Sequence, residues 1–145
     1  MQTFLPDADH YQSARVLHPV HHLGNQLYRE GLTLLRGGWR NHPASRMWRG
    51  YERELAAYLL ALLDELRRRG RWYGRVAVEL RKARRSFPKT GFPQWLGDQA
   101  FHAAHRSNLL RKDSEKGWDW YAKLGWTEKT DIPYVWPEGE RRNKT

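Results

Sequence analysis

The stretch from Asn41 to Gly70 restricts the fold of this chain most, because its apolar side chains recur at the period of an α-helix. Charged residues fill most of the positions between them. The apolar positions are Trp48, Tyr51, Leu55, Leu59, Leu62 and Leu66. Asn41 with Pro43 close behind is typical of a helix start, and Arg67 to Arg69 before Gly70 are typical of a helix end. The stretch therefore predicts one amphipathic helix of about 26 residues, about 40 Å long at 1.5 Å per residue.

Two neighbouring segments carry the same period. Residues 20–35 keep their apolar side chains on one side and a mixed polar face on the other. Residues 71–85 place Trp72, Val76 and Leu80 on one side of a strongly basic helix. A long helix is therefore expected on each side of the central one.

A fourth helix is expected from Gln99 to about Lys112, with Asp98 as its N-cap. Phe101 and Ala104 fall on its apolar side. Three polar side chains are expected together on the opposite side: His102, His105 and Arg106.

The remaining segments favour irregular structure. Residues 1–12 form a short extended lead-in, Ser13 caps a brief helical turn through Leu17, and residues 127–145 form an irregular tail with a frayed end. No internal repeat and no sustained strand pattern is present. We therefore expect an all-α fold, in which residues 1–145 form a single compact domain of three to four long helices with a C-terminal aromatic and basic segment.

The charge of the chain is strongly unbalanced. It has 26 Lys and Arg against 16 Asp and Glu, which gives a formal net charge of +10 and a pI near 10.2. This favours an anionic partner, with nucleic acid as the leading candidate and a plain soluble basic protein as the alternative. Eight Trp and seven Tyr lie among the basic residues and shift the balance towards nucleic acid.

The composition also excludes several classes of protein. There is no Cys, so neither a disulfide framework nor a thiolate zinc site is possible. We see no basic leader followed by a long apolar run, and no segment reaches the ~18 consecutive apolar residues of a membrane span. The expectation is a cytoplasmic, nucleoid-associated protein that binds no membrane.

Glu30 lies on the polar side of the first expected helix, within helical reach of Arg29 and Gln26. A carboxylate flanked by cations stays ionised, and it can stabilise a developing oxocarbenium ion or take a proton from water. The alternative is an ordinary surface ion pair.

A metal site is not expected. His102 and His105 stand three residues apart, but no third ligand follows a known metal-binding spacing. These histidines are expected either to donate hydrogen bonds to phosphate or to satisfy the core.

The segment from Trp118 to Trp126 alternates large rings with lysines. Such a segment can stack on exposed bases while the lysines neutralise phosphates. It can equally be a hydrophobic plug that packs onto the helices, and both interpretations stay open.

Four motifs together resemble the pyrimidine-dimer DNA glycosylase family, in its bacterial and phage branch. They are LHPVHHLGNQLYRE, NHPASRMW, FPQWLGDQAFHAAHRSNLLRK and WDWYAKLG, in that order, and they cover most of residues 13–126. The resemblance implies an all-helical DNA glycosylase with an associated abasic-site lyase and no cofactor. It implies a nucleophilic N-terminal amine, here that of Met1, which forms a Schiff base at the sugar C1′, and a glutamate on the first long helix that moves protons. It also implies a kinked duplex with an extruded nucleotide.

The chain departs from the family pattern at two places. The family glutamate follows the position of Gln26 by three residues, where this chain has Arg29. Glu30 comes one residue later, about 100° further round an α-helix, and takes that place only if the helix is shifted or bulged. Gln2 is large, so Met1 is expected to stay on the mature chain.

The leading hypothesis is a monomeric glycosylase for a damaged or modified pyrimidine in double-stranded DNA, with Glu30 and Met1 as catalytic residues. Arg46 and Arg49 are candidate phosphate contacts because the first turns of the central helix carry them beside free backbone N–H groups. The full set of candidate DNA-binding residues is His22, Arg29, Arg46, Arg49, His102, His105, Arg106, Arg111, Trp120, Tyr121 and Lys123. A diverged DNA-binding module without the chemistry is the alternative, and an RNA-associated protein is a weaker one.

Overall fold

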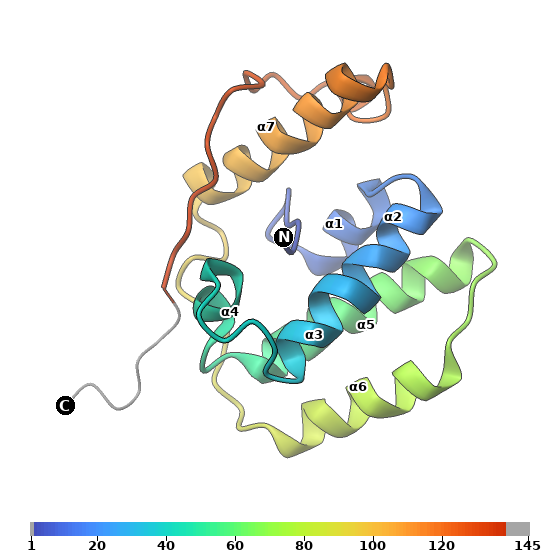
Figure 1. The fold of residues 1–145 in the computed structure, drawn as a ribbon, viewed down its shortest axis with the longest axis vertical. Helices are drawn as coiled ribbons and strands as arrows, with labels where there is room; N and C mark the ends of the chain where they lie inside the picture. The colour runs from blue at the N-terminus through green and yellow to red at the C-terminus, as the bar shows by residue number, and fades with distance from the viewer. Residues whose placement is uncertain (1, 139–145) are drawn as a thin grey trace.

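The computed structural model describes residues 2–138 of the 145-residue chain, and these residues form helices joined by loops, with no strand among them. The all-α class is therefore confirmed (Figure 1). In chain order the elements are α1 (His10–Val16), α2 (Val20–Asn25), η1 (Gln26–Gly31), α3 (Leu32–Leu35), α4 (Pro43–Trp48), α5 (Glu52–Arg68), α6 (Gly74–Ser86), α7 (Gln99–Lys116) and η2 (Ala122–Leu124). No helix in this part of the chain is both long and apolar enough to cross a membrane.

Helix α5 is the centre of the helical layer. It packs against α1, α2, η1 and α3 on one side and against α6 on the other (Figure 1). The apolar stripe predicted from the sequence is its buried face, since Leu55, Leu59, Leu62 and Leu66 are at most 1% exposed. Burial of this stripe is the main source of stability for the layer.

The single central helix expected from the sequence is two helices. Helix α4 ends at Trp48 and α5 begins at Glu52. Between them Gly50 has φ +87°, a left-handed conformation that favours glycine and cannot continue a right-handed helix. The prediction of one helix of about 26 residues is therefore wrong. The periodicity conceals the break because Trp48 and Tyr51 keep a spacing of three across it.

The caps of this region differ from expectation at the start and agree at the end. The N-cap of α4 is His42, whose Nδ1 accepts a hydrogen bond from Ala44 N–H at 3.0 Å, and not Asn41. Helix α5 ends at Arg68, and Gly70 follows with φ +88°. The cations and glycine expected at this end are therefore where a helix terminus needs them.

The first long helix runs without interruption from Val20 to Leu35 through α2, η1 and α3, as expected. Its middle part, Gln26–Gly31, is a π-helix rather than an α-helix. Gly31 lies directly on α5, where a Cβ would overlap with the side chain of Leu59. The absence of a side chain at Gly31 therefore lets the π-turn and α5 approach closely.

Helix α6 starts later than its sequence pattern indicated. It buries Val76 and Leu80 against α5, as predicted. Trp72, expected on the same side, precedes the helix and is 50% exposed, so that placement is wrong. Its ring lies instead under the guanidinium of Arg67, 4.9 Å from the ring centroid.

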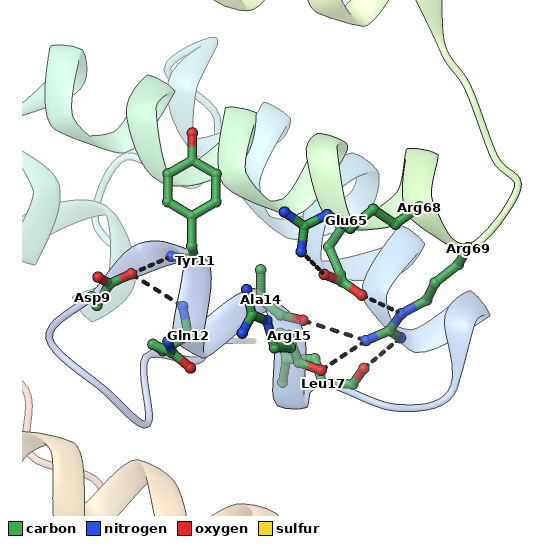
Figure 2. Close-up of polar contacts among 9 residues, drawn as sticks. All are labelled: Asp9, Tyr11, Gln12, Ala14, Arg15, Leu17, Glu65, Arg68 and Arg69. Atoms are coloured by element: carbon green, nitrogen blue, oxygen red, sulfur yellow. Dashed lines mark hydrogen bonds and ion pairs between the residues drawn. The ribbon is translucent and has the colours of Figure 1, made fainter.

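Helix α1 begins earlier than expected and is tied to α5 by one arginine. Its N-cap is Asp9, not Ser13, so the extended lead-in does not reach residue 12. At its other end Arg69 donates to the carbonyl of Leu17 at 2.6 Å and to that of Arg15 at 3.0 Å, while it also contacts Glu65 (Figure 2). The arginine thus satisfies carbonyls that the short helix leaves without partners.

Residues 2–6 are buried in the middle of the molecule, between α7 and the layer around α5 (Figure 1). Tyr58 on α5 donates its hydroxyl to the carbonyl of Phe4 at 2.6 Å. From the other side Arg106 on α7 donates to the carbonyl of Pro6 at 2.8 Å. The extended lead-in is therefore the layer that joins α7 to the other helices.

The tail is irregular, as expected, but its described part is bound to α7 rather than frayed. Ser107 donates its hydroxyl to the carbonyl of Lys129 and accepts the N–H of Ile132 at 3.1 Å. The tail runs back along α7 towards α4 (Figure 1). The frayed end expected from the charged sequence falls on residues 139–145, which lie outside the described residues.

Candidate active site

The π-helix η1 carries Glu30. A π-helix bonds i to i+5, which lets a helix hold one extra residue without losing its direction. The N–H of Leu32 donates to the carbonyl of Leu27 in this way. The bulge that the sequence comparison required for Glu30 is therefore present in the first long helix.

Glu30 lines an open pocket of about 420 Å³ together with Arg29, Thr33 and Trp39. This volume lies within the roughly 300–1,000 Å³ of typical ligand pockets. The pocket brings together the end of η1, the start of α3 and the loop before α4. It places one carboxyl group, one exposed guanidinium and one exposed indole around the same space.

The carboxyl group of Glu30 lies in an environment that changes its pKa. The side chain is half-buried, and its Oε2 is buried with no hydrogen-bond partner among the described residues. Burial raises the pKa of Glu30 above its usual value, while the nearby charges of Arg29 and Lys112 act to lower this pKa. A carboxyl with a raised pKa in a pocket is suited to general acid and base chemistry.

The start of the described chain lies beside the turn that carries Glu30. Gln2 and Thr3 are buried, and the N–H of Phe4 donates to Oε1 of Gln26 at 2.9 Å. Gln26 belongs to the same π-helix as Glu30. Met1, the expected nucleophile, lies outside the described residues.

The paired histidines of α7 are buried, so their expected position on a face opposite the core is wrong. His102 donates from Nδ1 to the carbonyl of Leu5 at 2.7 Å and accepts the N–H of Gly97 at Nε2 at 2.8 Å. His105 accepts the N–H of Leu5 at Nδ1 at 2.8 Å. The helix period shows two faces but not that residues 2–6 cover the second one. The alternative in which these histidines satisfy the core fits the structure.

Both histidines make these hydrogen bonds to the backbone as neutral imidazoles. Burial lowers the pKa of His105 to about 3, and burial also lowers the pKa of His102. Neither side chain is exposed enough to contact a phosphate. His22 is different: its half-buried ring lies at an edge-on angle to Phe4, with centroids 6.2 Å apart, and its Nδ1 is 3.1 Å from the carbonyl oxygen of His18.

The candidate arginines divide by their contacts. Arg106 is committed to structure, since it bonds the carbonyl of Pro6 and forms a 3.0 Å ion pair with Glu128. Arg29 and Arg49 are exposed, although Arg49 also donates to the carbonyl of Arg40 at 2.7 Å.

Arg46 and Arg111 are partly exposed, with side chains 42% and 40% accessible. Arg46 lies 3.6 Å from Glu138 and Arg111 lies 3.8 Å from Glu115. Such partly exposed ion pairs contribute little to stability and leave the guanidinium groups accessible to an anionic ligand.

The aromatic segment is partly a plug. Tyr121 is completely buried and its hydroxyl accepts the N–H of His18 at 3.1 Å, so Tyr121 is not accessible for stacking on a base. Trp120 is half-buried and stacks on Trp118 with centroids 4.0 Å apart. Lys123 is exposed and lies 3.3 Å from Asp119. The interpretation as a hydrophobic plug therefore holds for Tyr121, and stacking on bases stays a prediction for Trp120.

Three residues near Glu30 had no functional role in the sequence analysis. Lys112 on α7 places its Nζ 5.6 Å from the Phe4 ring centroid and adds a positive charge near Glu30. Tyr134 in the tail packs against Phe4, with ring centroids 6.2 Å apart. Trp39 lines the pocket. Only Trp39 carried a sequence signal, as a large aromatic residue directly after two glycines.

A larger pocket of about 500 Å³ lies between the α3–α4 loop and Phe87. Three arginines line it, Arg36, Arg40 and Arg49, and of these Arg36 is paired with Glu79 at 2.7 Å. Its acidic residue Glu52 accepts the N–H of Gly50 at 2.9 Å. The pocket at Glu30 is the better candidate because Oε2 of Glu30 is buried with no hydrogen-bond partner within residues 2–138. Within residues 2–138, no group of three or more His, Asp or Glu side chains is arranged to hold a metal ion.

Fold and site together define a small, strongly basic, all-α protein with a half-buried carboxyl group beside cations, which suits an anionic substrate. A model of the pyrimidine dimer DNA glycosylase family matches residues 1–77, more than half of the chain, and the chain belongs to this family. The matched part contains Glu30 and the buried lead-in, whereas α7 lies beyond it. No curated protein and no solved structure matched the chain.

Proposed function

We propose that this protein is a DNA N-glycosylase with abasic-site lyase activity, which removes a damaged or modified pyrimidine from double-stranded DNA. The observation that carries the proposal is the position of Glu30. It is a half-buried carboxyl with a raised pKa, on a π-turn that also holds the start of the chain, in a pocket beside Arg29. Family membership supports the same reaction class.

In the proposed reaction, the neutral N-terminal amine of Met1 attacks C1′ of the deoxyribose. The C1′–N bond to the base breaks, and the base leaves with its electron pair and takes up the proton that the attacking nitrogen loses. The bond from C1′ to the ring oxygen then opens as this oxygen takes the proton of Glu30, which leaves a Schiff base between the amine and C1′. Glu30, now a carboxylate, removes a C2′ proton, and the 3′-phosphate departs.

The proposed DNA contacts are cations that remain accessible around the pocket. Arg29 and Lys112 flank Glu30, and Arg111 lies on the same helix as Lys112. Arg46, Arg49 and Lys123 would extend the contact along a bent duplex. Cations held near the carboxyl group would also position the phosphates on both sides of the reacting sugar.

The experiment that tests this proposal is borohydride trapping on a duplex that carries one thymine dimer, and on the same duplex with an abasic site. The wild-type chain should form a covalent adduct, and Glu30→Gln should abolish base release. A version with one extra residue before Met1 should lose the adduct if the amine must occupy a fixed position. Glu115→Gln, an exposed acid on α7, is the matched control.

A different result would favour a different function. If the wild-type chain forms no adduct and releases no base, but binds duplex DNA with a steep salt dependence, it is a DNA-binding module without the chemistry. If structured RNA competes better than duplex DNA, the partner is RNA. Unchanged base release in Glu30→Gln would show that Glu30 is not the acid or base.

A further inference from the structure

Trp39 has an unusual backbone conformation for its residue type. Its φ is +51°, and it is the one non-glycine residue with positive φ in the described part of the chain. A bulky residue in this conformation carries a cost that the surrounding structure must offset, and such residues cluster at functional sites. Its side chain is 48% exposed, so burial returns little of this cost.

The turn that holds Trp39 is fixed on both sides. The N–H of Gly38 donates to the carbonyl of Thr33 at 2.8 Å, and the N–H of His42 donates to the carbonyl of Trp39 at 2.9 Å. Ser45 donates its hydroxyl to the carbonyl of Gly38 at 3.2 Å. A Cβ at Gly38 would lie 2.7 Å from Cγ2 of Thr33, so the turn also packs closely onto α3. The indole is therefore presented by a fixed turn.

The indole shares its pocket with the candidate acid. Trp39, Thr33, Arg29 and Glu30 line the same space of about 420 Å³, and Oε2 of Glu30 is buried with no hydrogen-bond partner in the described part of the chain. The ring of His42 also lies near Trp39, with the two ring centroids 6.5 Å apart. An exposed flat ring beside an unpartnered carboxyl oxygen and a guanidinium matches the parts of a nucleotide: base, sugar and phosphate.

We propose that Trp39 is a stacking platform for a nucleobase displaced from the duplex, and that it holds this base next to the sugar on which Glu30 acts. This inference rests on the proposed function and names the group that the pocket binds. The displaced base is either the damaged base itself or the base opposite it. Both present the same planar face to an indole.

Trp72 provides a matched comparison. It is exposed to the same extent, 50% against 48%, but it lies beside α6 and contacts Arg67. Its φ is not in the left-handed region, and it lines none of the space around Glu30. A general effect of removing one surface tryptophan should appear equally at both positions.

The test measures equilibrium binding by Trp39→Leu, Trp39→Phe and Trp72→Leu, each combined with Glu30→Gln so that no base is released. The probe is a duplex with one thymine dimer, and an undamaged duplex serves as reference. We expect Trp39→Leu to weaken binding to the dimer duplex about ten- to a hundred-fold, Trp39→Phe to restore most of this loss, and Trp72→Leu to bind as the parent does. The slope of affinity against salt should not change, because no phosphate contact is lost.

Two further duplexes identify which base is held. One carries an abasic analogue at the lesion and keeps the opposite bases, and the other carries the dimer opposite abasic analogues. The loss caused by Trp39→Leu should persist only on the duplex that still contains the displaced base. An equal loss on undamaged DNA, or no loss on any duplex, would overturn the inference.

Stability separates this role from a structural one. Glycine accepts a positive φ, so Trp39→Gly should not lower the melting temperature, yet it should bind the dimer duplex as poorly as Trp39→Leu. A lower melting temperature with unchanged binding would show that Trp39 only packs the turn. If the wild-type chain releases the base and Trp39→Leu binds normally, the stacking role of Trp39 is wrong and the proposed glycosylase function stands. If no base is released but Trp39→Leu weakens binding to dimer DNA, the proposed chemistry fails and the stacking role stands.

Discussion

The backbone N–H of Phe4 donates to Oε1 of Gln26 at 2.9 Å, and both residues are buried. This bond fixes the start of the described chain to the π-turn that also carries Glu30. It joins positions 22 residues apart in sequence. The position of the π-turn that carries Glu30 is therefore supported by an interior hydrogen bond.

Gln26→Leu should destabilise the protein. The substitution keeps the volume but leaves the buried N–H of Phe4 without an acceptor, which typically costs about 1–3 kcal/mol. Chemical denaturation at pH 7 measures the free energy of unfolding. Gln94→Leu, at an exposed position, is the control. Equal stability of the two variants would mean that water replaces the lost acceptor.

Arg69→Met should loosen α1 from α5, because Arg69 donates to three carbonyls at the end of α1 and is only 16% exposed in its side chain. Loss of hydrogen bonds from a charged donor should cost about 1.5–3 kcal/mol. Arg68 contacts the same Glu65 at 3.7 Å but is 59% exposed, so Arg68→Met should change stability by less than about 1 kcal/mol (Figure 2). Similar losses in both variants would contradict the assignment of the carbonyl contacts.

The stability of the fold should fall at acid pH through His105. Its pKa is about 3 in the folded state against an ordinary 6.5, so between these values the unfolded chain binds a proton that the folded chain does not. The stability is complete above about pH 6.5 and declines as the pH falls, by at most about 1.4 kcal/mol per pH unit for this proton.

Melting temperatures measured from pH 7 to pH 4 test this expectation. His105→Asn keeps an acceptor near the N–H of Leu5 but does not titrate, so its stability should depend less on pH than that of the wild type. His10, with its pKa lowered by burial to about 4, should supply a further decline in both proteins. An identical pH dependence in the wild type and His105→Asn would show that His105 is not the titrating group.

Glu30→Gln should raise stability at neutral pH. Burial raises the pKa of Glu30 in the folded state, so the stability linked to its proton is present below the ordinary value of about 4.5 and is lost as the pH rises through the raised pKa. The difference in melting temperature between variant and wild type should therefore be larger at pH 7 than at pH 4. A lower melting temperature for the variant at pH 7 would indicate that the carboxylate has a stabilising partner.

Arg111→Gln should reduce the salt dependence of DNA binding. If Arg111 neutralises one phosphate, the slope of log affinity against log salt should become less steep by about 0.9. Binding isotherms between 50 and 200 mM salt, conditions over which such contacts lose most affinity, measure it. Arg85→Gln removes an exposed cation from the end of α6 and should leave the slope unchanged. A smaller slope in Arg85→Gln would place the DNA on the α6 face instead.

The sequence by itself determined the all-α class and most of the helical segments, because a helix buries one stripe of its own residues and that stripe repeats along the chain. It did not show the break between α4 and α5. Leu55, Leu59 and Leu62 form this stripe in α5. The start of α7 was predicted from a different signal, the N-cap residue Asp98. The sequence motifs on the first long helix and on α7 also indicated the family, and membership is confirmed by the match over residues 1–77.

The tertiary structure decided where the polar groups lie. Nothing in the sequence indicated that residues 2–6 would cover the polar side of α7 and make His102 and His105 interior groups. Nor did it indicate that Tyr121 would be buried with its hydroxyl bonded to the backbone of His18. Periodicity reports only which residues share a face of one element. The burial of a face depends on a second segment, here about 100 positions away in sequence from His105. Residues within 29–39 line the pocket at Glu30, but the positive charge of Lys112 and the lead-in at Phe4 reach this turn from distant parts of the sequence.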